Sequence, residues 1–406
     1  MSDPAKSSGP ATLWGGVAFG LALAAFAAFQ QFKLPPVLPV MLEAYDYDLV
    51  VAGGFMSIYA LMGLLFSLPV SRLINRQGPL PALWGALGLF LAGNLLVLVF
   101  PQSGWLVLAC RALEGLGFTV MALVGPASAN AAAARHHLPL VFALTAMWIP
   151  TGQFAAALVA LPTQDAGLWR PVWYVSIALT VGLAFWLIQR RGRGLAIGGP
   201  GKNARALTAE ERRLLWVAGI AFLIFSGQFI GYMTWFPAYM VTSLGFTPAA
   251  AIYAYLVPVV LVAAFNLVSA RLMNRGWTPA RLLIIGFIME TACWALLPVA
   301  GEGLFGLILL IVYGAGAGLV PAGLFAMPST IVGQGGPAMA AFGLIMTLRN
   351  LGVLAGPLLL AVLIEPDGGW GLAAPAFAVI TGIALPLCLW LSRQLNRRTA
   401  EGELST

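Results

Sequence analysis

Charged residues are scarce in this sequence. Only 9% of its 406 residues are Asp, Glu, Lys or Arg, whereas 60% are hydrophobic, and the mean hydropathy is +0.91. A soluble protein needs a largely polar exterior, so this composition excludes one and indicates that lipid hydrocarbon surrounds the chain. The net charge of +7 does not indicate a nucleic-acid partner, because the basic residues occupy short gaps between apolar runs instead of one patch.

Cysteine and histidine are also rare. Cys110, Cys293 and Cys388 lie singly inside apolar runs, with no Cys-x-x-Cys spacing, which predicts buried thiols and neither a disulfide framework nor a metal site. His136 and His137 share a polar gap, and we expect a solvated loop pair rather than a pH sensor.

The sequence shows no catalytic constellation. It contains no recognisable Ser/His/Asp set, phosphate-binding loop or ATPase domain. We therefore expect no enzymatic activity and no cofactor, so transport would draw its energy from a gradient. The polar segment 1–12 has no signal-peptide pattern, and the first apolar run is expected to be retained as a helix.

Long apolar runs dominate what is present. A membrane helix needs about 20 residues, and twelve candidates cover residues 13–41, 50–70, 79–100, 105–127, 139–161, 172–189, 214–242, 248–269, 280–300, 304–328, 338–363 and 372–392. The polar segment 190–213 is predicted to be a linker between bundles 13–189 and 214–392, with tails 1–12 and 393–406. The expected fold is an all-α membrane protein of two pseudo-symmetric six-helix bundles.

The basic residues predict the orientation. With a cytoplasmic N-terminus, the inside segments hold Lys6, Arg72, Arg76, Arg135, Arg190, Arg191, Arg193, Lys202, Arg205, Arg212, Arg213, Arg271, Arg275, Arg281, Arg393, Arg397 and Arg398. The outside loops hold Arg170 alone among basic residues. By the positive-inside rule both termini are cytoplasmic, in a bacterial-type inner membrane.

A short loop sequence occurs twice at half-chain spacing. Ser71, Asn75, Arg76 and Gly78 end a long apolar run, and Ala270, Asn274, Arg275 and Gly276 do so again, with Arg76 and Arg275 lying 199 residues apart. Two similar membrane bundles in tandem produce such a repeat.

These features resemble the major facilitator superfamily over essentially the whole chain. The family's loop between helices 2 and 3 reads Gly-x-x-x-Asp-Arg-x-Gly-Arg-Arg, which Ser71, Asn75, Arg76 and Gly78 match with Ser for Gly and Asn for Asp. In the family, the acidic residue belongs to a charge network that latches the two halves. Because Asn75 only hydrogen-bonds, the resemblance implies a weaker latch, with Asn75, Arg76, Gly78, Asn274 and Arg275 forming gating loops.

Two further segments refine the resemblance. Residues 111–117 fit the family's helix 4 pattern, Arg-x-x-x-Gly-x-Gly. Residues 29–39 are similar to helix 1 of bacterial cyanate- and nitrate/nitrite-permease-like members. The antiporter signature of helix 5 is not visible around Trp148 and Gly152, which argues against drug/proton exchange. In the family, helices 1, 4, 7 and 10 line a central cavity where the two halves meet.

Charges inside membrane helices are costly and usually functional. Arg349 sits deep in its apolar run, where a guanidinium can grip an anion, although a structural ion pair with Glu290 is the alternative. Arg111 and Glu114 are three residues apart and share a helix face; they are candidates for proton coupling, with Glu290 less favoured, or simply neutralise each other. Lys33 either lines the cavity or extends toward the membrane surface.

Uncharged polar and aromatic residues complete the candidate site. Gln228, Tyr232 and Trp235 recur at helical spacing. Gln30, Gln31, Trp148, Thr151, Tyr313 and Asn350 add hydrogen-bonding groups at matching depth, although each is also compatible with packing or with a membrane-edge belt. If Lys33, Arg111 and Arg349 share one pocket with Glu114, its formal charge is +2, which favours an anionic substrate.

The sequence thus predicts a monomeric secondary transporter in the lipid bilayer that takes up a small anion together with protons. Two alternatives remain open. An efflux pump for drugs or metabolites would have an apolar cavity, and a membrane sensor or scaffold would keep the fold without transporting.

Overall fold

The computed structural model describes residues 11–134, 137, 141, 144, 145, 147–163, 166–190, 206–301, 303–333, 338–365, 368–400 and 402. The N-terminal bundle holds α1 (Trp14–Phe32), η1 (Pro35–Val37), α2 (Leu38–Tyr45), α3 (Leu49–Gln77), α4 (Pro79–Val99), α5 (Gly104–Ala131), α7 (Trp148–Ala160), η3 (Leu161–Thr163) and α8 (Arg170–Arg190). The C-terminal bundle holds α9 (Ala209–Thr242), α10 (Pro248–Asn274), α11 (Pro279–Leu296), η4 (Leu297–Val299), α12 (Leu304–Val332), α13 (Ala338–Leu363), α14 (Ala373–Gly382) and α15 (Ala384–Ala400).

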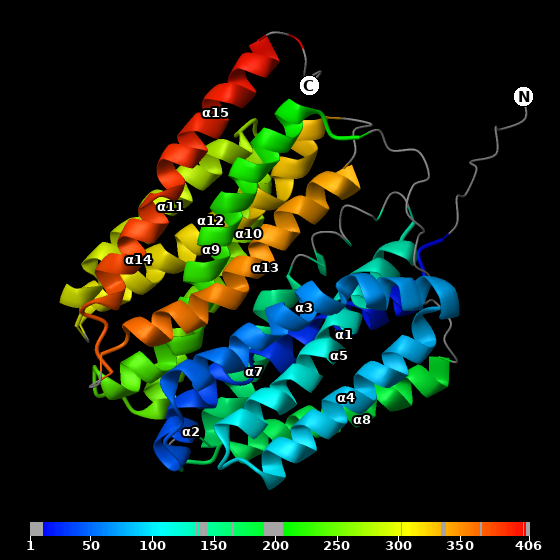
Figure 1. Ribbon diagram of the computed structural model, residues 1–406, viewed down its shortest axis with the longest axis vertical. Helices are drawn as coiled ribbons and strands as arrows, with labels where there is room; N and C mark the ends of the chain where they lie inside the picture. The colour runs from blue at the N-terminus through cyan, green and yellow to red at the C-terminus, as the bar shows by residue number, and fades with distance from the viewer. Residues whose placement is uncertain are drawn as a thin grey trace, which may run out of the picture.

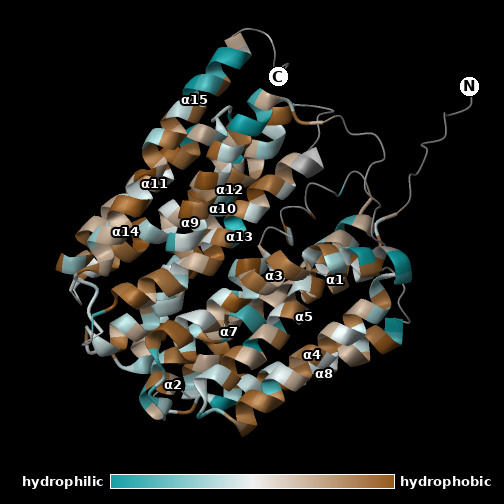
Figure 2. Ribbon diagram, viewed as in Figure 1, coloured by the Kyte–Doolittle hydropathy of each residue, from teal (hydrophilic) through white to brown (hydrophobic). Residues whose placement is uncertain are grey.

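The all-α membrane fold is confirmed. Eleven candidate spans are found among the described residues. The fifth predicted run, 139–161, is described chiefly by α7, whose 13 residues fall short of a span, and much of 138–146 lies outside the described residues. Figure 1 shows the two bundles, and Figure 2 shows hydrophobic residues along the helices with hydrophilic ones gathered toward helix ends.

Prolines break two of the predicted continuous helices. The first span, 14–45, is divided after Phe32 because Pro35 and Pro36 have no backbone N–H to continue the α-helix. The last span is divided between α14 and α15, since Pro386 cannot bond the carbonyl of Gly382. Both breaks lie within candidate membrane spans, so each span consists of two helical pieces.

Short capping motifs set the loop geometry. Asp48 accepts hydrogen bonds from the N–H groups of Val50 and Val51 at the start of α3, and Thr208 forms a capping box with Glu211 at the start of α9. Each of the two repeated loops also contains a glycine with positive φ, Gly78 at 80° and Gly276 at 86°. Only glycine adopts such angles readily, so both loops depend on it.

The loop between α5 and α7 corrects one expectation. His137 is not a free loop residue, because its Nδ1 hydrogen-bonds with Thr12 Oγ1 at 2.8 Å and its ring packs 5.0 Å from that of Trp14. His136, predicted to be its solvated neighbour, lies outside the described residues. The start of α1 is therefore held to the end of α5, where Leu13 also donates to the carbonyl of Ala132.

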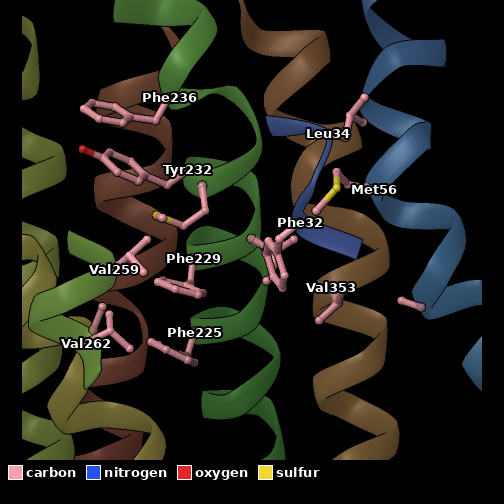
Figure 3. Packing of buried hydrophobic residues seen from close by; sticks show 14 of the residues in the cluster. Phe32, Leu34, Met56, Phe225, Phe229, Tyr232, Phe236, Val259, Val262 and Val353 are labelled. Atoms are coloured by element: carbon pink, nitrogen blue, oxygen red, sulfur yellow. The ribbon is translucent and has the colours of Figure 1, made fainter. Parts of the chain in front are cut away.

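The bundles meet at one end. We call the end where α1 begins and α15 finishes the termini end, and the opposite one the far end. Gly53 of α3 lies against the carbonyl of Pro357 of α13, and η1 and α2 contact α9, all toward the far end. Figure 3 shows Phe32 and Leu34 at the break in the first span, with Val353 of α13 and Met56 of α3 on the same side of α9.

The faces of α3 and α13 that meet at the far end are uncovered toward the termini end. On α3, Gly54, Ile58 and Leu61 face Leu354 and Leu358 of α13 across a small apolar gap. Helical spacing continues this stripe to residues 65 and 68, which are 57% and 69% exposed. The inter-bundle contact therefore ends about midway along α3, and the structure is open toward the termini end.

Glycines allow the closest helix contact of the C-terminal bundle. On α13, Gly352 and Gly356 lie against α9, where they meet Leu223, Gly227 and Gly231. Each helix thus carries a Gly-x-x-x-Gly pair, and the absence of side chains lets the two backbones touch.

Candidate functional site

The break in the first span exposes backbone carbonyls inside the N-terminal bundle. In a continuous helix the carbonyl of Gln31 would accept from the N–H of residue 35, but Pro35 has none. Arg111 of α5 donates to this freed carbonyl of Gln31 from Nη2 at 2.8 Å, and from Nη1 to the neighbouring carbonyl of Gln30 at 2.8 Å. The Arg111 guanidinium therefore holds the broken helix in place.

Lys33, the first residue after α1, is fully buried. Its ammonium donates to the side-chain oxygens of Gln30 and Asn94 at 2.6 Å each and to Glu114 Oε1 at 2.9 Å, and Ser176 Oγ lies 3.4 Å away. These partners come from α1, α4, α5 and α8. Lys33 therefore does not extend to the membrane surface, which was one of its two predicted placements.

Glu114 connects both cations. Its Oε2 accepts from Arg111 Nη1 at 2.7 Å and from the Tyr59 hydroxyl at 2.7 Å, while Oε1 pairs with Lys33. We call Gln30, Lys33, Tyr59, Asn94, Arg111, Glu114 and Ser176 the lysine cluster. It carries two cations and one anion, all without solvent exposure, and such charges are tolerated only when paired in this way.

A second polar node lies in the C-terminal bundle. Gln228 Oε1 of α9 accepts from Trp294 Nε1 at 2.8 Å and from the Tyr313 hydroxyl at 3.0 Å. Tyr232 stacks on Tyr313 with ring centroids 4.1 Å apart. Gln228, Tyr232 and Tyr313, all predicted site residues, are thus brought together by α9 and α12, with Trp294 of α11 added.

The two clusters occupy equivalent positions of the repeat. Lys33 and Tyr232 are 199 residues apart, as are Glu114 and Tyr313, the same spacing as the loop arginines. The positions that hold an ion pair in the first bundle therefore hold stacked tyrosines in the second.

Glu290 lies beside this second node. Its carboxyl group is completely buried and neighbours the amide of Gln228. Among the described residues no Lys or Arg forms an ion pair with it. The structural pair of Glu290 with Arg349, one of the sequence-based alternatives, is therefore absent.

Arg349 stands apart from both clusters. Its Nη1 donates to Asn350 Oδ1 at 2.9 Å, and no carboxylate among the described residues pairs with it. The structure thus does not gather Lys33, Arg111 and Arg349 into one pocket of charge +2. One turn further on the same face of α13, Val353 is buried in the core, whereas Arg349 is half-buried, so the cover of this face decreases from Val353 toward the termini end.

The remaining predicted residues have separate surroundings. Trp235 does not join Gln228 and Tyr232 in the second polar node. Its Nε1 donates to the carbonyl of Pro357 at 2.9 Å. Trp148 stacks on Phe118 of α5 at 5.8 Å, and the hydroxyl of neighbouring Thr151 bonds its own helix. Neither contacts the lysine cluster directly.

Sequence reasoning missed several cluster members. Tyr59, Asn94 and Ser176 each complete the coordination of Lys33 or Glu114. The available signal was weak, since it consists of single polar residues within apolar runs, but Asn94 and Ser176 are fully buried and hydrogen-bonded. Within the described part of the chain, no group of three or more His, Cys, Asp or Glu residues has metal-binding geometry.

Two helical bundles that meet at one end and bury polar clusters in their interiors define a membrane transporter of the two-bundle class. The family model described as Major Facilitator Superfamily matches residues 20–357, and the chain belongs to that family. It is a multi-pass membrane protein and a secondary transporter, not an enzyme.

Individual relatives are more distant. The chain is 31% identical over 166 residues to the inner membrane transport protein YajR of Escherichia coli (strain K12), a match that covers 37% of this chain and 34% of that protein. The chain thus spans about a third of this relative's length. The crystal structure of a point mutant of the nucleoside transporter NupG superposes with a TM-score of 0.68 at 12% identity, covering 94% of this chain and 99% of that one. That likeness shows the fold alone, and the cyanate- and nitrate-permease-like branch receives no support.

Proposed function

We propose that this transporter takes up a small anion together with protons, by alternating access between its two bundles. The observation that carries the proposal is Arg349, an arginine within a membrane span whose guanidinium has no carboxylate partner among the described residues. A half-buried cation without a counter-ion inside a membrane span is costly. An anionic substrate at the boundary of the open interface supplies that counter-ion, in the bidentate geometry that guanidinium groups favour.

The lysine cluster is the proposed proton-coupling element. Glu114 is shared by Lys33 at 2.9 Å and Arg111 at 2.7 Å, and a proton on Glu114 would release both cations. Arg111 holds the broken first span, whose far-end piece, η1 and α2, contacts α9. A change at Glu114 therefore reaches the inter-bundle contact through Arg111. Glu290, buried without a paired cation, is the second candidate proton carrier.

The loops with Arg76 and Arg275 lie at the termini end, where the structure is open. They are the proposed gates, which approach each other when this end closes. With the termini in the cytoplasm, the present conformation faces inward. The transporter is proposed to act as a monomer in a bacterial inner membrane, with only the lipid, protons and its substrate as partners.

The Arg349→Ala variant is expected to lower anion uptake tenfold to a hundredfold, because a hydrogen-bonded charge contact contributes about 1.5–3 kcal/mol. Uptake of labelled acetate, lactate, benzoate, cyanate and, as an uncharged comparison, uridine is measured in proteoliposomes with an inward proton gradient. The exposed Arg393→Ala is the control and should retain wild-type uptake. Arg349→Lys keeps the positive charge but lacks the planar guanidinium, and its anion uptake should lie between those of the wild type and Arg349→Ala.

Each other outcome identifies an alternative. If drugs or uridine are transported and Arg349→Ala leaves their transport intact, the anion proposal is wrong and the efflux or neutral-substrate function replaces it. If no compound of a broad panel moves in either direction, a sensor or scaffold is favoured. If anions move without response to the proton gradient, proton coupling is rejected while anion transport stands.

Orientation is tested separately with single added cysteines, because all three native cysteines are buried. Ser243→Cys is placed at the far end and Arg397→Cys at the termini end, both at exposed positions. In intact bacterial cells, a membrane-impermeant maleimide should label Ser243→Cys and should label Arg397→Cys only after permeabilisation. The reverse pattern would place the termini outside.

A further inference from the structure

A cavity of about 360 Å³ lies inside the C-terminal bundle, between α9, α10, α11 and α12. Tyr232, Phe236, Tyr253, Trp294 and Tyr313 form much of its wall. All of these residues belong to one bundle. The cavity is therefore separate from the interface between the bundles, where Arg349 lies.

The cavity opens sideways. Tyr253 of α10 and Leu307 of α12 line it and are also 61% and 45% exposed, so the wall reaches the outer surface of two membrane spans. Gly301, Gly303 and Gly306 at the rim have no side chains to narrow the entrance. Because α10 and α12 are both candidate membrane spans, a molecule that is soluble in hydrocarbon can reach this wall from the bilayer.

The lining selects against charge. None of the described residues that line the cavity is Asp, Glu, Lys or Arg, whereas ring faces are abundant. Tyr232 stacks on Phe236 at 4.7 Å and on Tyr313 at 4.1 Å. Aromatic walls of this kind favour a flat, uncharged ring system that adds to the stack.

One polar group in this wall lacks a partner. Tyr232 is 3% exposed, and its hydroxyl makes no hydrogen bond to any described residue. Figure 3 shows its oxygen pointing away from α9, on the side of α9 where Val259 and Val262 of α10 lie. Buried tyrosine hydroxyls are normally hydrogen-bonded, so a ligand in the cavity would complete this one.

We propose that the cavity is a binding site for a neutral, planar aromatic molecule of two or three rings that carries one hydroxyl or carbonyl group and arrives through the bilayer. The size fits, because an engineered apolar cavity of about 150 Å³ holds one benzene. The ring system lies among Tyr232, Phe236 and Trp294, and its polar group bonds the Tyr232 hydroxyl.

Such a ligand regulates transport without being the transported substrate. Trp294 and Tyr313, two of the wall residues, hold Gln228 of α9, and α9 contacts both η1–α2 and α13. An occupied cavity fixes the packing of α9 against α11 and α12. A ligand that binds the two conformations with unequal affinity therefore shifts the exchange between them.

The test uses the full chain in nanodiscs, with radiolabelled 2-naphthol and naphthalene in equilibrium dialysis and empty nanodiscs as background. The wild type should bind 2-naphthol about tenfold more tightly than naphthalene, the effect of one hydrogen bond. Tyr232→Phe should remove that preference and leave naphthalene binding unchanged. Ala254→Phe, which fills the cavity, should weaken both ligands at least tenfold, whereas Ala264→Phe on the lipid-facing side of α10 should bind as the wild type does.

Three results would overturn the proposal. Equal 2-naphthol binding by the wild type, Ala254→Phe and Ala264→Phe would mean membrane partition only. An unchanged 2-naphthol preference in Tyr232→Phe would exclude the hydroxyl contact, and this conservative variant is informative even if Ala254→Phe does not fold. Displacement of 2-naphthol by trimethylphenylammonium at equal concentration would show a site for organic cations instead.

Discussion

Glu114→Gln is expected to lower the free energy of unfolding by about 3–5 kcal/mol, the usual cost of removing one partner from a buried ion pair. Glu114 is the common partner of Lys33 and Arg111, and none of the three side chains is exposed. Without its negative charge, two cations remain buried side by side. Glutamine keeps the volume, so the loss reports the charge rather than a cavity.

The measurement is the unfolding equilibrium of the purified protein in mixed micelles with increasing dodecyl sulfate. Glu210→Gln is the matched control, because Glu210 is 57% exposed and pairs with Arg398 at 3.8 Å, a surface contact of about 0–1 kcal/mol. A Glu114→Gln variant no less stable than Glu210→Gln would mean that the cluster does not depend on the Glu114 charge.

Lys33→Met extends the comparison. Alone, it leaves Arg111, Glu114 and Tyr59 in contact, so its cost should be smaller than that of Glu114→Gln. Combined with Glu114→Gln, it removes one of the two uncompensated cations, and the double variant should be more stable than Glu114→Gln alone. Such non-additivity is expected for residues in direct contact, and additive losses would contradict the shared role of Glu114.

The sequence was sufficient to predict the architecture because lipid imposes simple rules. Apolar runs of spanning length, separated by polar gaps, follow from the cost of burying charge in hydrocarbon, and the half-chain repeat of Arg76 and Arg275 indicated two similar bundles. The same cost identified Lys33, Arg111, Glu114 and Glu290 as unusual residues. The pairing of Arg111 with Glu114 followed from helix geometry, because residues three apart share a face.

The sequence did not predict whether each of these side chains turns into the interior of its own bundle or toward the interface between the bundles. Pattern and spacing place a residue on a helix at a certain depth, but they do not say which neighbouring helix its side chain meets. The predicted positive pocket combined Lys33 and Arg111, which turn into the N-terminal bundle, with Arg349, which stays at the interface. Trp235 illustrates the same limit. The sequence placed it on one helical stripe with Gln228 and Tyr232, but Gln228 bonds Trp294 inside the bundle, whereas Trp235 bonds the carbonyl of Pro357 on α13.

The break in the first span could have been predicted from the sequence. Pro35 and Pro36 stand together inside the predicted run 13–41, and the missing N–H groups follow from their chemistry. Prolines are frequent in membrane helices, however, and most of them leave the helix continuous, as Pro69 does in α3 and Pro258 in α10. The break at Lys33 is identifiable only with Arg111 in place as the donor to the freed carbonyls.

Gly356→Ala is expected to cost about 3 kcal/mol, the upper end for an over-packed core position. A Cβ atom at Gly356 would overlap the carbonyl oxygen and Cα of Gly227, which are backbone atoms of α9 and cannot turn aside as a side chain does. The helices α9 and α13 would have to separate, and the contact between Gly352 and Leu223 would then loosen. The same unfolding equilibrium in mixed micelles measures the loss.

Gly343→Ala on the same helix is the matched control, with an effect of opposite sign. A Cβ atom at Gly343 meets nothing within 4 Å, so the change only removes glycine's excess conformational freedom and should stabilise the protein by about 0.5–1 kcal/mol. If both variants shift stability in the same direction and by similar amounts, helix propensity rather than the α9–α13 contact governs these positions. Opposite shifts would establish that the Gly-x-x-x-Gly pairs hold α13, and with it Arg349, against α9.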